Sequence, residues 1–148
     1  MAVNTSKVVV GGIAAGVVIT VIDFVSQMMI LGDRMKADAN AFKTGLGDDM
    51  AAMSGMAIAG YTIMNLVVGM LLVWTYAAVR PRFGPGPRTA SYVALVFFTF
   101  GLILTSNYMV MGMMSQGLWL TYGAIWLVTL LVATYVGAML YSEDSAPG

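Results

Sequence analysis

The chain has 148 residues, of which 59% are hydrophobic and only 9% are charged, whereas soluble domains carry about 25% charged residues; this composition and a mean hydropathy of +0.85 exclude a water-soluble fold and indicate one membrane domain. Seven Lys or Arg balance seven Asp or Glu, so there is no basic excess for nucleic acid. The absence of Cys and His excludes Cys/His zinc sites and histidine-ligated haem, and we expect no cofactor and no bound metal.

Four apolar segments are long enough to cross a bilayer as helices, since about 20 apolar residues span the hydrocarbon. We predict a single membrane domain over residues 1–148, with spans at about 8–31, 52–79, 91–114 and 118–141. The first segment is longer than the apolar core of a secretory signal, about 7–15 residues, so we expect it to remain as a span. The expected fold class is an all-α integral membrane four-helix bundle with both termini on the same side.

The first span contains one acidic residue, Asp23, in an otherwise uncharged segment. Gly12, Gly16, Thr20, Asp23 and Gln27 recur at helical steps of three and four, so they share one face. Glycines at such spacing let another helix approach closely and predict helix packing through Gly12 and Gly16. Asp23 on the same face is therefore expected to point toward protein rather than lipid.

The side chain of Asp23 needs polar partners inside the bundle, because no predicted span contains Lys or Arg. Depth counted along each span from its outer end places Asn65, Asn107 and Tyr108 near the level of Asp23. We therefore predict an intramembrane polar layer, whose members are Asp23, Thr20, Gln27, Asn65, Asn107 and Tyr108.

Three interpretations of Asp23 remain open. The carboxyl belongs to a hydrogen-bonded layer that sets the register of the helices, it forms a proton- or cation-coupled binding site, or it meets another subunit that supplies a base. A protonated carboxyl is expected in the first case, because no cation is near.

The segment over residues 32–50 is expected to be an outer loop that carries a short surface helix. Asp33 is placed to cap a helix over residues 34–44, and Gly45 is placed to end it. Such a helix is expected to lie on the membrane surface.

A basic loop is predicted over residues 80–90, where RPRFGPGPRTA contains three prolines and two glycines that interrupt a helix. Thr89 or Ser91 is expected to cap the third helix, and a tight turn is expected at 115–117. Cations flanking spans favour the cytoplasmic side, so the loop and both termini are expected there. We expect the loop cations to contact lipid headgroups or a partner; they are Arg80, Arg82 and Arg88. The tail over residues 142–148 is expected to be disordered.

Methionine is abundant, with 14 residues. Met109 and Met113 lie one helical turn apart, and clustered thioethers are ligands that Cu(I) prefers. Methionine is also a common filler in irregular packing. Because no Cys or His accompanies them, packing is the favoured interpretation.

Two stretches carry a resemblance to known proteins. GGIAAG in the first span and RPRFGPGPRTA after the second resemble a group of small uncharacterised bacterial membrane proteins, which implies a bacterial inner membrane. In architecture the chain resembles the small multidrug resistance exporters, which have four spans, one acidic residue in the first span, and a dimeric state. That resemblance implies that Asp23 is the exchange carboxylate. The exporters have glutamate at this point, are shorter, and lack a loop as long as residues 32–50.

The function expected from these features is that of a non-enzymatic accessory or structural subunit. It would pack against itself or a larger membrane complex, in contact with membrane lipids and with other membrane protein subunits. The alternative is a proton-coupled transporter of a small solute that acts as a homodimer through Asp23.

Overall fold

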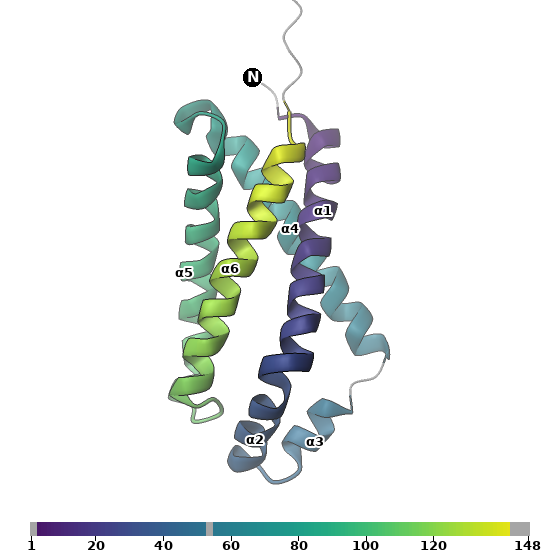
Figure 1. Ribbon diagram of the computed structural model, residues 1–148, viewed down its shortest axis with the longest axis vertical. Helices are drawn as coiled ribbons and strands as arrows, with labels where there is room; N and C mark the ends of the chain where they lie inside the picture. The colour runs from purple at the N-terminus through teal and green to yellow at the C-terminus, as the bar shows by residue number, and fades with distance from the viewer. Residues whose placement is uncertain (1–2, 53–54, 143–148) are drawn as a thin grey trace, which may run out of the picture.

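The computed structural model describes residues 3–52 and 55–142, and every regular element in these ranges is a helix (Figure 1). Four helices are long and apolar enough to cross a membrane, which confirms the all-α membrane bundle. The predicted disordered tail lies outside the described residues, apart from Ser142. The elements in chain order are α1 (Thr5–Ser26), the π-helix η1 (Gln27–Leu31), α2 (Gly32–Phe42), α3 (Leu46–Ala51), α4 (Gly55–Phe83), α5 (Pro87–Val110) and α6 (Gln116–Leu140).

The most extensive packing in the bundle is between α1 and α4. Helix α1 also packs against α6, α5 packs against α6 and α4, and α4 packs against α6. The core gathers at one end of the bundle, because it is built from the first two-thirds of α1, the second half of α4, the first half of α5 and the second half of α6. Its largest fully buried side chains are Ile19, Leu72, Leu130, Val73, Thr89, Thr129 and Thr134.

Glycines allow the close approach of α1 and α4. A Cβ atom added to Gly12 would lie 2.7 Å from the Cα of Met70, and one added to Gly16 would lie 2.6 Å from the Cα of Leu66. From the other side, a Cβ on Gly69 would collide with the backbone of Gly16 and Gly12. The two backbones are therefore in direct contact, and any side chain at these positions would force them apart.

The first apolar helix continues beyond its predicted end. α1 passes into the single wide turn of η1 and then into α2 without a break, so that α2 extends downward from α1 in Figure 1. Gly32 fits at this point because a Cβ there would lie 2.6 Å from the carbonyl oxygen of Gln27, to which the Gly32 N–H donates. The widened turn thus explains the need for glycine directly after it.

The expected helix over residues 34–44 is wrong in its boundaries and in its cap. α2 begins at Gly32 as a continuation of the preceding helix, so Asp33 lies inside the first turn and makes no capping hydrogen bond. Gly45 does not end this helix but precedes α3 with a left-handed φ of 85°.

Two hydrogen bonds join helix α2 to the end of the bundle that lies away from the core. The backbone N–H of Ser115 donates to Asp38 Oδ2 at 2.7 Å, and Arg34 Nη1 donates to Thr121 Oγ1 at 3.3 Å. These contacts join α2 to the start of α6, and the position of α2 on the membrane surface stays a prediction.

The predicted basic loop over residues 80–90 is wrong in extent. α4 continues through Pro81 to Phe83, because a proline near the end of a helix removes only one backbone hydrogen bond from its last turn. The chain then leaves the helix at Gly84, whose φ is 83° and whose N–H donates to the carbonyl of Arg80 at 2.8 Å. A left-handed glycine of this kind is a common helix end.

Helix α5 starts without the predicted cap. Pro87 stands in its first turn directly after Gly86, where the missing N–H of proline has no partner to lose. Thr89 and Ser91 are therefore not capping residues. The Thr89 hydroxyl instead donates back to the carbonyl of Gly84 at 2.7 Å and closes the turn between α4 and α5.

The turn between α5 and α6 begins earlier than the predicted 115–117. α5 ends at Val110, and Gly112 adopts a φ of 75°. Ser115 caps α6 by accepting a hydrogen bond from the Leu118 N–H at 3.3 Å. The left-handed glycine, which the predicted third span included, decides where the helix stops.

The described ends of the chain meet at the end of the bundle that holds the core. The backbone N–H of Asn4 donates to the Tyr141 hydroxyl at 3.3 Å. The start of α1 and the end of α6 therefore lie side by side.

Candidate functional site

A hydrogen bond between two helices involves Asp23, the one acidic residue in α1, α4, α5 and α6, all of whose residues the structure describes. Asn65 Nδ2 of α4 donates to Asp23 Oδ2 of α1 at 3.1 Å, and both side chains are half-buried. The pair lies beside the glycine contact, because a Cβ on Gly16 would lie 2.9 Å from the carbonyl oxygen of Asn65 itself. The close approach of α1 and α4 therefore places the amide within reach of the carboxyl.

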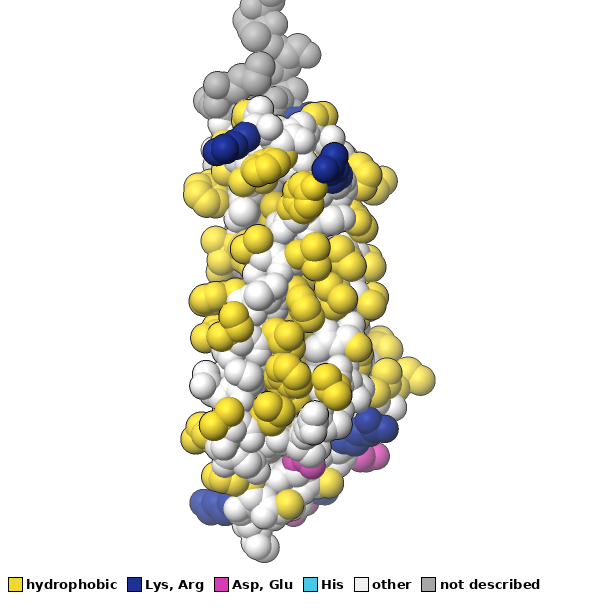
Figure 2. Space-filling view, turned by 90° about the vertical axis from the view of Figure 1, so that its left-hand side faces the viewer, with side chains coloured by type: hydrophobic (Ala, Val, Ile, Leu, Met, Phe, Trp, Pro, Cys, Tyr) yellow, Lys and Arg dark blue, Asp and Glu magenta, His cyan; other side chains and the backbone are white. Residues whose placement is uncertain are grey.

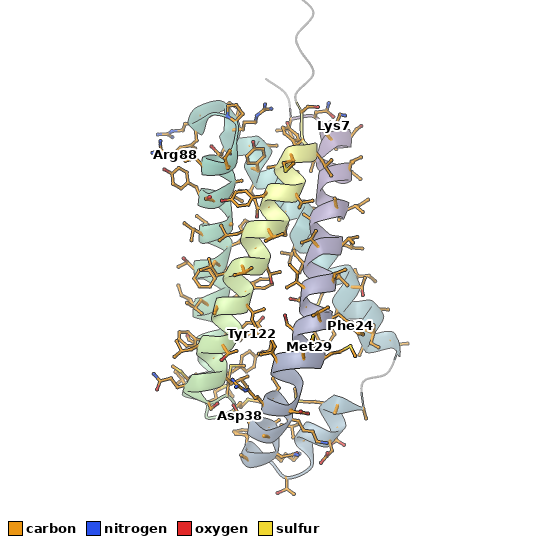
Figure 3. The ribbon with its side chains drawn as sticks, viewed as in Figure 1. Lys7, Phe24, Met29, Asp38, Arg88 and Tyr122 are labelled. Atoms are coloured by element: carbon orange, nitrogen blue, oxygen red, sulfur yellow. The ribbon has the colours of Figure 1, made fainter. Side chains whose placement is uncertain are left out.

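Tyr122 of α6 is the phenol that interacts electrostatically with Asp23. Tyr122 also interacts electrostatically with Tyr61 of α4 and Tyr108 of α5, whose side chains are 58% and 50% exposed. Tyr122 and Phe24, the residue after Asp23, lie at a similar level of the bundle (Figure 3). The ring of Tyr122 is held by stacking on Trp126, with ring centroids 6.4 Å apart.

The polar layer predicted from the sequence did not include Tyr122, which interacts electrostatically with Asp23. The first span was predicted to end at residue 31, and the depth of Asp23 was counted from that end. Because the first helix continues to Phe42, the level of Asp23 relative to residues of α6 cannot be obtained by counting back from residue 31. The position of Tyr122, about two turns inside an apolar helix, was the feature of the sequence that could have indicated a place near Asp23.

Two predicted members of the polar layer from the first span, Thr20 of α1 and Gln27 of η1, make no hydrogen bond to Asp23. The Thr20 hydroxyl donates to the carbonyl of Gly16 in its own helix at 2.9 Å. Gln27 is exposed, and its Nε2 lies 3.3 Å from the sulfur of Met35, across the widened turn. Both polar groups are satisfied locally.

The two predicted members on α5 lie in its last turns. Asn107 is exposed, and its amide donates to the carbonyl of Leu104 at 3.0 Å. Tyr108 is 50% exposed, and it interacts electrostatically with Tyr122. Of the six predicted members, the structure joins only Asp23 and Asn65 by a hydrogen bond to one another.

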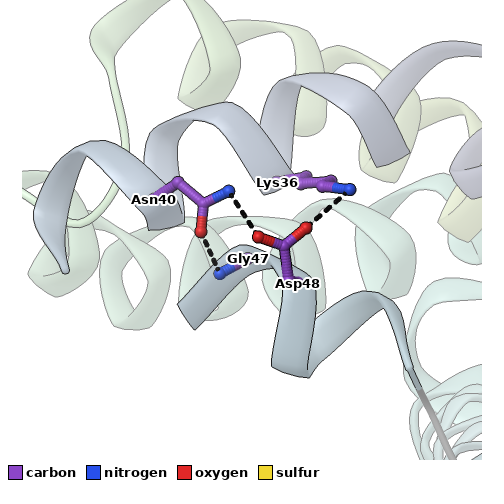
Figure 4. Close-up of polar contacts among 4 residues, drawn as sticks. All are labelled: Lys36, Asn40, Gly47 and Asp48. Carbon is purple, nitrogen blue, oxygen red and sulfur yellow. Dashed lines mark hydrogen bonds and ion pairs between the residues drawn. The ribbon is translucent and has the colours of Figure 1, made fainter. Parts of the chain in front are cut away.

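A second polar cluster joins α2 to α3 outside the membrane-spanning segments (Figure 4). Asp48 Oδ1 lies 2.7 Å from Lys36 Nζ, and Asn40 donates to Asp48 at 3.4 Å while accepting from the Gly47 N–H at 2.7 Å. The hydrogen bond and the charge of Lys36 lower the pKa of the Asp48 carboxyl below its ordinary value. Both charges are exposed, so the cluster fixes the hairpin rather than forming a reactive site.

The cations at the core end divide into two groups. Arg80 is half-buried with its guanidinium carbon 5.6 Å from the centre of the Tyr141 ring. Arg82 and Arg88 are exposed and lie over the rings of Phe83 and Tyr92. The three arginines that the sequence grouped together therefore do not form one surface.

These features define a multi-pass membrane protein with one intramembrane carboxyl–amide pair. The described residues contain no group of three or more Asp, Glu, His or Cys side chains arranged to hold a metal ion. No protein family model, curated protein or solved structure matches the chain.

Proposed function

We propose that this protein is a non-enzymatic structural or accessory subunit of a bacterial inner membrane, with its termini in the cytoplasm. It packs against a second copy or against a larger membrane complex. The glycine contact between α1 and α4 and the Asp23–Asn65 bond hold the subunit together, and its outer helices meet the partner.

One observation carries this proposal: α4 is packed along only part of its length. Its buried residues all lie between Gly69 and Ala77, whereas Met56 is 85% exposed and Met64 is 62% exposed. The first half of α4 extends away from α5 and α6 in Figure 1. Asn65 and Leu66 contact α1, but the large apolar side chains on the other face of this half of α4 are exposed, and such a face in a membrane helix is open to another subunit.

The mass of the particle extracted from its native membrane in mild detergent tests this proposal. Co-migration of the chain with a large assembly, or as a homo-oligomer whose contact includes the first half of α4, is the expected result. The partner should protect Met56 and Met64 from oxidation in the extracted particle. A monodisperse single chain in which both methionines oxidise freely contradicts the proposal.

A second candidate function is proton-coupled transport of a small solute by a homodimer. It is favoured by the Asp23 carboxyl, which lies inside the first span, accepts a hydrogen bond from Asn65 and interacts electrostatically with Tyr122 of α6. A carboxyl that exchanges a proton among hydrogen-bonding groups is a common element of proton relays in membranes.

Asp23→Asn separates the two candidates. The amide keeps the hydrogen-bonding capacity toward Asn65 and removes the exchangeable proton, so a structural subunit should retain its stability and its assembly. A proton-coupled carrier should lose at least about tenfold of its transport rate in vesicles with an imposed pH gradient, as general acid–base groups contribute that much or more. Unchanged transport in Asp23→Asn vesicles would remove this candidate.

A further inference from the structure

The outer face of α5 carries an open, apolar hollow with a volume of about 490 Å³. Its lining residues recur at steps of three and four along the helix, and they are Tyr92, Leu95, Val96, Thr99, Phe100 and Ile103. From the first to the last of these the hollow is about 16 Å long, at 1.5 Å per residue. It is thus a shallow, open groove on the surface of one helix, and it runs along the helix in the direction in which lipid chains lie.

The groove offers almost no polar group to a ligand. The Thr99 hydroxyl donates to the carbonyl of Leu95 at 2.8 Å, so its proton is already used. The Tyr92 hydroxyl accepts a hydrogen bond from Arg88 Nε at 2.8 Å and marks the end of the groove. An occupant of the groove itself is therefore a hydrocarbon chain rather than a hydrogen-bonding molecule.

Two arginines stand at the Tyr92 end of this groove. The rings of Phe83 and Tyr92 meet edge to face with centroids 6.0 Å apart. The guanidinium of Arg82 lies 5.9 Å from the centre of the Phe83 ring, and that of Arg88 lies 5.7 Å from the centre of the Tyr92 ring. The aromatic pair thus connects the two cations on either side of the turn between α4 and α5.

The charge at this end is of one sign in the part of the chain that the structure describes. Its cations are Lys7, Arg80, Arg82 and Arg88. Within residues 3–52 and 55–142, the acidic residues lie in the second half of α1, in α2 and in α3. They are Asp23, Asp33, Asp38, Asp48 and Asp49. Figure 2 shows the α5 side of the molecule, with apolar side chains along its length and Lys or Arg side chains at the upper end.

We propose that the α5 groove and the pair Arg82 and Arg88 form a binding site for one phospholipid with an anionic headgroup. The acyl chain lies in the groove between Tyr92 and Ile103, and the headgroup phosphate meets the guanidinium groups, whose planar donors suit phosphate oxygens. The site does not depend on whether the protein is a subunit or a carrier. Of the three arginines expected to contact lipid, this site uses only Arg82 and Arg88, because the guanidinium of Arg80 lies over the ring of Tyr141.

Native mass spectrometry of the purified full chain tests the site. The protein is offered equal amounts of phosphatidylglycerol and phosphatidylcholine with the same acyl chains. We expect one tightly retained lipid and a preference for phosphatidylglycerol of about thirtyfold, from about 1 kcal/mol for each arginine near the headgroup. The double variant Arg82→Gln/Arg88→Gln should reduce this preference to about that of bulk binding.

The matched control is Lys7→Gln/Lys43→Gln, which removes the same charge away from the groove. Lys7 stands at the same end as Arg88 but on the opposite side of the bundle (Figure 3). The control should keep the headgroup preference. An equal loss in both double variants, or no preference in the wild-type protein, would overturn the proposal because the contact would be a general charge effect.

Filling the groove tests the acyl-chain half of the site separately. Thr99→Phe places a ring in the groove and removes only a hydrogen bond within one turn. We expect it to lower retention of both lipids several-fold while the preference between headgroups is kept. If Thr99→Phe instead abolishes a dimer and leaves lipid retention unchanged, the groove is an interface between two copies and the lipid site is wrong.

Discussion

Gly69→Leu is expected to destroy the folded bundle. Its side chain would occupy the space in which the backbone of α1 passes at Gly12 and Gly16, and backbone atoms cannot rotate out of the way. Overpacking of this kind costs about 3 kcal/mol or more when the helices must separate. Unfolding in mixed micelles, followed by circular dichroism and compared with the wild-type protein, measures the loss.

Gly60→Leu is the matched control because it makes the same change in the same helix. A Cβ added to Gly60 meets nothing within 4 Å, and a leucine favours the helix over glycine by up to about 1 kcal/mol. The two substitutions should therefore move the free energy of unfolding in opposite directions. Equal effects would show that α1 and α4 do not touch at Gly69.

The second large effect is expected from Asn65→Leu. This substitution leaves the Asp23 carboxyl without the amide that donates to it, and a polar group left without a partner in a buried position costs about 1–3 kcal/mol. The double variant Asp23→Leu/Asn65→Leu should recover most of that loss, because it removes both polar groups together. A double-mutant cycle on unfolding free energies gives the coupling between the two residues.

Asn107→Leu serves as the control for this experiment. Asn107 was expected in the same layer, but its exposed amide bonds only to the carbonyl of Leu104 in its own helix. Its replacement should change the free energy of unfolding by no more than about 0.5 kcal/mol. A coupling near zero between Asp23 and Asn65, or a large effect of Asn107→Leu, would contradict the arrangement seen here.

The wrong predictions at the ends of the helices have a common cause. Pro81 was expected to break the second span, yet α4 ends three residues after Arg80, at Phe83, where Gly84 turns left-handed. Proline and glycine signal that a helix ends nearby, but the residue at which it stops depends on which backbone groups find partners. In the same way Gly112 ends α5 before the turn that the sequence suggested.

The prediction of the polar layer was incomplete for a similar reason. Asp23 and its face of small residues were recognised from helical periodicity, which is a local property. The choice of Asn65 over Asn107 depends on how far each helix extends and on which neighbour it meets. Neither quantity is contained in the spacing of residues along one span.

The sequence by itself determined that this is a membrane protein with four spanning helices, because apolar length and the lack of charge are enforced by the bilayer on each helix separately. It also determined that Asp23 lies on the face of α1 that carries the glycines. The tertiary structure alone decided that α4 contacts this face, that Arg80 lies over the ring of Tyr141, and that α2 continues α1. These features arise from contacts between distant segments, in which backbone fit at a few glycines outweighs the nearly uniform hydrophobicity of the helices.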